Sequence, residues 1–116
     1  MRHNRYTIDT VEQQEHRYNT LGDWYGTTIT VTELANPKYI DLIAIHELVE
    51  MVLCRHAGIT PDMVDEWDMK LHPDAPDPGS LSDCPYGQQH AVATMVEQMV
   101  CGALGLDWTT YLEETS

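Results

Sequence analysis

Residues 37–57 form a segment that is apolar around almost its whole circumference when it is drawn as a helix. Asn36 and Pro37 precede it as a side-chain acceptor and a first-turn proline, the usual start of a helix. Gly58 is suited to end it. A helix that is apolar on all sides is normally buried. We therefore expect this helix at the centre of the fold, which constrains the rest of the chain more than any other feature.

Three ionisable residues, His46, Glu47 and Glu50, lie in the middle of this helix. Buried charges are paired or bind metal, because an isolated one is costly. Residues four apart share a helix face, so a His46 nitrogen and a Glu50 oxygen can bind one ion at about 2 Å. Glu47 lies about 100° further round, where it can accept a proton from a metal-bound water. The same pattern on a solvated helix is only an ordinary surface contact, but the apolar surroundings favour a metal site.

The best third ligand is His90, near the start of a helix that we expect from about Pro85 to just before Gly105. Catalytic zinc usually has three protein ligands and one open position. The polar stripe that contains His90 lies opposite an apolar arc; the stripe is His90, Thr94, Glu97 and Cys101, and the arc is Val92, Met95, Val96, Met99 and Ala103. The stripe is either a solvated face or the wall of a cleft. In a cleft, Glu97 would be a partner of a ligand or an extra ligand, and Tyr86 could stabilise an oxyanion.

Period-two alternation predicts strands near residues 6–11 and 27–33, with turns around Trp24 and Tyr25 between them. Thr60 and Pro61 begin a short helix to about Lys70, residues 72–85 form a loop, and Trp108 and Tyr111 lie on a short tail. The prediction is a single α+β domain, residues 1–116. It has a short antiparallel or mixed N-terminal sheet and three helices, with the metal site between the first and the last.

Other polar candidates are weaker. His72, Asp74, Asp77 and Asp83 lie in the proline-rich loop, where turn formation is the ordinary role and the rim of the site is the alternative. Cys54 follows Glu50 by one turn and is either near the metal or a buried thiol. His56 is expected on the surface, and nothing in the sequence assigns a role to His3 or His16.

The sequence His46-Glu47-Leu48-Val49-Glu50 resembles the HExxH helix of the zincin metallopeptidases, with glutamate in place of the second histidine. The likeness covers about residues 27–100 and includes an edge strand from Thr28 to Glu33. It implies that His46, Glu50 and His90 bind Zn2+ and that Glu47 is the general base. A carboxylate is a harder ligand than imidazole, so Fe2+ or Mn2+ also fits. The chain is also similar to small uncharacterised bacterial and phage proteins with a HELVE helix followed by a PYxxxH segment.

The net charge and the apolar pattern limit the kinds of partner that this protein can bind. The formal net charge is −13 and the six Lys and Arg are scattered, which disfavours nucleic-acid binding. No apolar run is long enough for a membrane span, and the first residues lack the apolar core of a secretory signal. Three cysteines without a CxxC pair indicate free thiols in a reducing compartment. We therefore expect a cytoplasmic protein; the sequence does not indicate its oligomeric state.

The predicted function is metal-dependent hydrolysis of a peptide or another small amide, with an extended substrate along the strand at Ile29–Val31. Two alternatives stay open. The first is a helical, MazG-like nucleotide pyrophosphohydrolase, in which Glu47 and Glu50 would pair with Asp65 and Asp68 around magnesium. The second is a non-catalytic phage or bacterial accessory protein that uses the same fold for binding.

Overall fold

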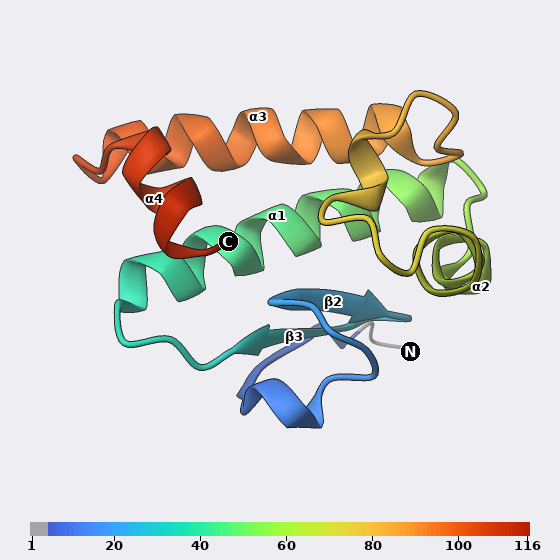
Figure 1. The fold of residues 1–116 in the computed structure, drawn as a ribbon, viewed down its shortest axis with the longest axis horizontal. Helices are drawn as coiled ribbons and strands as arrows, with labels where there is room; N and C mark the ends of the chain where they lie inside the picture. Colours follow the sequence, from blue (N-terminus) through green and yellow to red (C-terminus); the bar gives the residue numbers. More distant parts are fainter. Residues whose placement is uncertain (1–4) are drawn as a thin grey trace.

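The computed structural model describes residues 5–116 and has the predicted α+β architecture (Figure 1). A three-stranded sheet covers one side of a long central helix, and a second long helix covers the other. The elements are β1 (Thr7–Val11), a 3-10 turn (Gln13–Glu15), β2 (Gly22–Tyr25), β3 (Thr28–Thr32), α1 (Pro37–His56), α2 (Pro61–Asp65), a π-helical turn (Glu66–Leu71), a second 3-10 turn (Pro78–Ser80), α3 (Gly87–Ala103) and α4 (Trp108–Glu114).

The sheet is mixed, with strand order β1-β3-β2. β3 pairs in parallel with β1 and antiparallel with β2, so it is the central strand. The expectation that Thr28–Glu33 forms an edge strand is therefore wrong. Residues 12–21 carry the chain from β1 to the far side of β3, where β2 becomes an edge. An extended substrate along Ile29–Val31 is excluded for the same reason, because both sides of that strand are already paired.

Helix α1 is the centre of the fold, as predicted. The Asn36 side chain accepts a hydrogen bond from the Lys38 amide at its start. Gly58, with a positive φ of 75°, lets the chain turn back at its end. Leu42, Met51 and Cys54 of α1 are fully buried. The helix itself packs against both the sheet and α3. The polar residues in the middle of α1 are therefore held inside the protein.

Helix α3 turns its polar stripe inward. Glu97 is 8% exposed and Cys101 is fully buried, whereas Met95 and Met99 are 61% and 72% exposed. The stripe therefore faces α1, and it is not the solvated face. Most of the apolar arc faces solvent instead, the reverse of the usual arrangement of a surface helix.

The C-terminal segment differs from the prediction. Residues 108–114 form a fourth helix, α4, where a short tail was expected. Asp107 starts it, because its side chain accepts a hydrogen bond from the Thr110 amide. Tyr111 is buried, with its ring centroid 5.0 Å from that of Tyr39 on α1. The domain therefore has four α-helices in its described residues rather than three.

β2 (Gly22–Tyr25) is a strand where turns around Trp24 and Tyr25 were expected. The segments between α1 and α3 follow the prediction. Helix α2 and the π-helical turn occupy the segment in which a short helix was expected. Residues 72–85 form a loop apart from the turn Pro78–Ser80. None of the described helices combines the length and the apolar character needed to cross a bilayer.

Candidate metal centre

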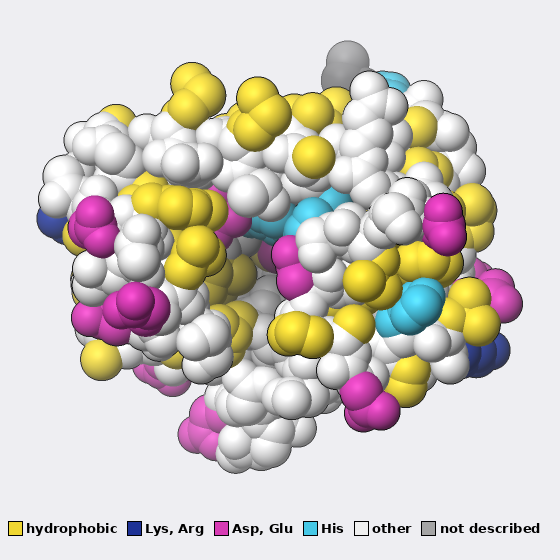
Figure 2. Space-filling model, turned by 45° about the horizontal axis from the view of Figure 1, so that its top comes forward, with side chains coloured by type: hydrophobic (Ala, Val, Ile, Leu, Met, Phe, Trp, Pro, Cys, Tyr) yellow, Lys and Arg dark blue, Asp and Glu magenta, His cyan; other side chains and the backbone are white. Residues whose placement is uncertain are grey.

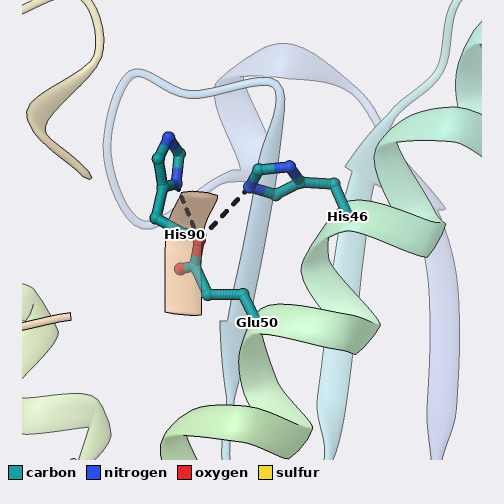
Figure 3. A group of neighbouring side chains, drawn as sticks. All are labelled: His46, Glu50 and His90. Atoms are coloured by element: carbon teal, nitrogen blue, oxygen red, sulfur yellow. Dashed lines mark hydrogen bonds and ion pairs between the residues drawn. The ribbon is translucent and has the colours of Figure 1, made fainter. Parts of the chain in front are cut away.

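The structure brings His46, Glu50 and His90 together (Figure 3). His46 Nε2 is 3.2 Å from Glu50 Oε2, and His90 Nδ1 is 2.9 Å from the same oxygen. One donor atom from each of the three side chains lies within 4.8 Å of the others. Zinc bonds of about 2.0–2.2 Å in a tetrahedron place ligand atoms roughly 3.3 Å apart. The three side chains, from α1 and α3, are therefore close to the spacing that one ion requires.

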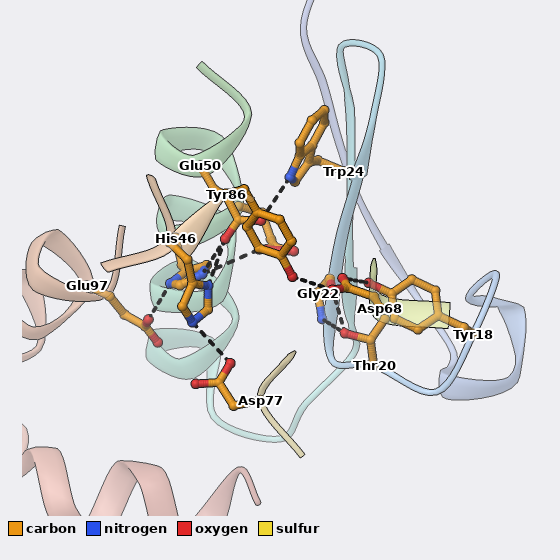
Figure 4. Close-up of polar contacts among 12 residues, drawn as sticks. Tyr18, Thr20, Gly22, Trp24, His46, Glu50, Asp68, Asp77, Tyr86 and Glu97 are labelled. Carbon is orange, nitrogen blue, oxygen red and sulfur yellow. Dashed lines mark hydrogen bonds and ion pairs between the residues drawn. The ribbon is translucent and has the colours of Figure 1, made fainter. Parts of the chain in front are cut away.

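The second nitrogen of each histidine is held by a carboxylate (Figure 4). His46 Nδ1 is 2.8 Å from Glu97 Oε1 on α3, and His90 Nε2 is 3.0 Å from Asp77 Oδ1 in the loop before α3. Such partners fix the tautomer and the ring orientation of histidine ligands in metal sites. Each ring thus directs its remaining nitrogen toward Glu50.

The second oxygen of Glu50 is held as well. Trp24 Nε1, on β2, donates a hydrogen bond of 3.1 Å to Glu50 Oε1, which leaves Oε2 for the two imidazoles. Glu97 is anchored in turn, since the Tyr111 hydroxyl on α4 donates to its Oε2 at 2.6 Å. The three candidate ligands are therefore oriented by side chains from the sheet, α3, α4 and a loop.

Glu47 lies beside the cluster without a firm partner. Its Oε2 is 3.8 Å from His46 Nε2, too far for a hydrogen bond, and its carboxyl group makes no hydrogen bond with any described residue. Glu47 is only 9% exposed, yet it lines the cavity described below. A carboxylate in this position is free to bind a ligand or to accept a proton.

Two glycines let the backbone approach the site closely. A Cβ atom at Gly79 would be 2.5 Å from Cγ of the His90 ring. A Cβ atom at Gly22, on β2, would be 2.6 Å from Ile43 Cγ2 and 2.9 Å from Glu47 Cγ. Such distances are far below ordinary contact. Glycine is therefore required at both positions for His90 and Glu47 to lie where they do.

The ionisation of the cluster follows from these contacts. Burial opposes a proton on His46, but hydrogen bonds to its carboxylate partners outweigh burial and raise its pKa to about 11. The same balance raises the pKa of His90 to about 9. Glu50 is buried too, yet the two imidazoles lower its pKa below the ordinary value. Burial, reinforced by the neighbouring Glu50 carboxylate, raises the pKa of Glu47. Without an ion, the cluster is a network of protonated imidazoles around one carboxylate.

The cluster opens into a cavity of about 770 Å³. Figure 2 shows a hollow in this face with histidine and acidic side chains inside it. The walls come from residues 18–24, from α1, from the loop at residues 73–79, from α3 and from α4. The volume is within the range of about 300–1,000 Å³ that small-molecule sites occupy. A ligand can therefore reach the cluster from solvent.

Tyr86 lines this cavity, but its hydroxyl group is already engaged. It donates a hydrogen bond to Asp68 Oδ1, in the π-helical turn, and Tyr86 is only 2% exposed. Its ring is perpendicular to that of His90, with centroids 6.2 Å apart. To stabilise an oxyanion, the hydroxyl would have to leave Asp68 for the substrate.

The other described polar residues considered from the sequence lie outside the cluster of His46, Glu50 and His90. Cys54 is fully buried in the core, outside the ligand cluster, and burial raises its pKa to about 12. His56 is exposed, as are Asp74 and Asp83. The His72 ring lies on Trp67, with centroids 4.2 Å apart, and His16 Nε2 is 2.8 Å from Thr32 Oγ1. His3 lies outside the described residues.

Three supporting residues were not predicted: Trp24, Asp77 as the partner of His90, and Tyr111. Asp77 was assigned mainly to turn formation, and Trp24 to a turn between strands. The sequence did contain a signal for the helix that carries Tyr111, because Asp107, four positions earlier, is a residue type that commonly caps the start of a helix. Nothing in the local sequence of Asp77 or Trp24 indicates their contacts with the site.

Comparisons with protein-family models, curated proteins and solved structures find no match for this chain. The class that the structure defines is an α+β domain with a His-Glu-His cluster on the floor of a cavity.

Proposed function

We propose that this protein is a metal-dependent hydrolase that cleaves a peptide or another small amide. The observation that supports this most directly is the orientation of the three candidate ligands. Each has one polar atom held by another side chain, and the remaining atoms meet at one point. In the absence of an ion these three atoms contact one another, and a bound ion would replace those contacts.

The donor set fits a divalent ion. Two imidazoles and one carboxylate form a common three-ligand set of catalytic zinc, and the carboxylate also suits Fe2+ or Mn2+. His46, Glu50 and His90 would hold the ion. When bound, it would polarise an amide carbonyl and make a water molecule more acidic. Displacement of the imidazole protons would be part of its binding, since a metal requires the neutral ring.

Glu47 is the residue proposed to accept a proton from the attacking water. It lies next to His46 on the cavity wall and has no hydrogen-bond partner to lose. Its raised pKa favours proton uptake. Tyr86 is proposed as an oxyanion donor, at the expense of its bond to Asp68. The cavity would hold a short segment or a small molecule.

The first experiment measures metal content. Purified protein analysed by elemental mass spectrometry is expected to hold about one equivalent of zinc, iron or manganese. His46→Ala and His90→Ala should both lose it. His56→Ala, an exposed histidine on the same helix, is the matched control and should keep it. Retention of metal by both site variants would refute the centre.

The second experiment separates binding from catalysis. Glu47→Gln should abolish amide hydrolysis in a peptide-library assay while the metal content stays unchanged. Glu66→Gln, an exposed glutamate outside the cavity, should leave both unchanged. Intact hydrolysis in Glu47→Gln would show that another group accepts the proton. Full metal content with no hydrolysis of any substrate would favour the accessory binding protein.

No observation favours the pyrophosphohydrolase alternative. That hypothesis assumes an all-helical fold, whereas this domain has a mixed sheet. Asp65 is already paired with Arg17 at 2.8 Å. Within the described part of the chain, the residues that line the cavity include no Lys or Arg to bind a diphosphate.

A further inference from the structure

The cavity walls are acidic far beyond the metal cluster. Among residues 5–116, six carboxylate residues and no Lys or Arg line the cavity; the carboxylates are Asp23, Glu47, Glu50, Asp68, Asp77 and Glu97. In Figure 2 the Lys and Arg side chains lie only at the margins of this face, away from the hollow. One bound divalent ion would leave an excess of negative charge. An anionic ligand is therefore disfavoured, and a ligand with a positive group is favoured.

Asp68 is a buried carboxylate in this wall that has no positively charged partner among the described residues. It is 9% exposed, and within the described part of the chain it receives hydrogen bonds only from two neutral groups, the hydroxyls of Tyr86 and, at 3.4 Å, Tyr18. A carboxylate has about four acceptor positions, so part of its capacity is unused. No cationic side chain contacts it among the described residues. Arg17, which is near Tyr18, directs its nitrogens to Asp23 and Asp65 instead.

The surroundings of Asp68 suit an amino group. The hydroxyl groups of Tyr18 and Tyr86 meet at the Asp68 carboxylate, and all three side chains line the cavity. An ammonium group has three donors, so it could pair with the carboxylate and also donate to the lone pairs of the hydroxyl oxygens. Tyr86 also contacts His90, so this wall and the metal cluster belong to one cavity. A single ligand can therefore bind both.

We propose that Asp68, with Tyr18 and Tyr86, is a subsite for a protonated amine of the substrate. The substrate class is then an amide that carries an amino group, such as a peptide with a free N-terminus or a lysine side chain. This inference depends on the proposed function, because the scissile group is taken to lie at the metal cluster. It assigns selectivity to residues that bind no metal.

The test uses zinc-loaded protein and three hydroxamates as probes, with affinity measured by titration calorimetry. Nα-acetylnorleucine hydroxamate carries no amine. Norleucine hydroxamate carries a free α-amine, and Nα-acetyl-lysine hydroxamate carries a free side-chain amine. At least one amine probe should bind about tenfold more tightly than the neutral one, as expected for a hydrogen bond to a charged group. Asp68→Asn should remove that preference.

One variant controls for charge. Asp83→Asn makes the same charge change at an exposed loop position outside the cavity, and it should keep the preference. Equal binding of all three probes to the wild type would overturn the amine subsite alone. Failure of every probe to bind the zinc-loaded protein would overturn the proposed placement of the scissile amide at the metal, and the subsite with it.

Discussion

Gly79→Ala tests the metal centre without changing any ionisable group. The new Cβ atom would be 2.5 Å from His90 Cγ and 2.6 Å from Nδ1, the atom that faces Glu50. Ordinary contact needs about 3.5 Å, so the ring would have to retreat by about 1 Å. Metal–ligand distances tolerate only about 0.2 Å. A shift of the turn Pro78–Ser80 instead would displace the adjacent Asp77, which holds the other side of the ring.

The expected result is a loss of zinc affinity of at least about a hundredfold, measured by competition with a fluorescent chelator. Gly102→Ala is the matched control, because it lies on the same helix as His90 and a Cβ atom there meets nothing within 4 Å. It should bind zinc as the wild type does.

A double variant separates this effect from simple misfolding. In the His90→Ala background, Gly79→Ala meets no imidazole ring and so creates no clash with it, and it should cost little further thermal stability. Wild-type zinc affinity in Gly79→Ala would refute the reasoning, since His90 could then not be a ligand held in this position.

Three further results are expected. The zinc association constant should rise with pH, by up to about a hundredfold per unit between about pH 7 and pH 9. The reason is that His46 and His90 are both protonated there in the metal-free protein and must lose their protons when zinc binds. Calorimetry in buffers of different ionisation enthalpy counts the released protons, and an association constant that does not change with pH would contradict the assigned protonation. Tyr111→Phe should weaken zinc binding by about tenfold, because Glu97 loses the hydrogen bond that orients it. An unchanged zinc affinity would show that α4 does not support the site. Gly22→Ala should lower the free energy of unfolding by about 1–3 kcal/mol through overpacking against α1, which denaturant titration measures.

The parts of the fold that could be predicted are those set by local pattern. The apolar circumference of residues 37–57 predicted a central helix, and Asn36-Pro37 predicted its start, because both signals operate within a few residues. The spacing of His46 and Glu50 likewise placed both on one helix face. Their meeting with His90 was predicted from ligand chemistry, and the structure brings the three together.

The parts that could not be predicted depend on long-range packing. The sequence predicted an antiparallel or mixed sheet, but it did not predict the strand order. β1 pairs in parallel with β3, and β2, which lies between them in sequence, pairs with the opposite side of β3. The polar stripe of α3 was ambiguous in sequence, since amphipathicity alone does not say which side is inside. The contact of Asp77 with His90 depends on the path of an irregular loop, which has no periodic signal.

The outward methionines of α3 supply a built-in chemical reporter. Met95 and Met99 present their thioethers to solvent on the side of α3 turned away from His90 and Glu97. Mild peroxide should convert them to sulfoxides before the buried Met51 reacts, because access governs this oxidation. Peptide mass spectrometry after a brief exposure would then measure how much of the outer surface of α3 is covered by a neighbour in solution, with the interior methionine as its internal reference.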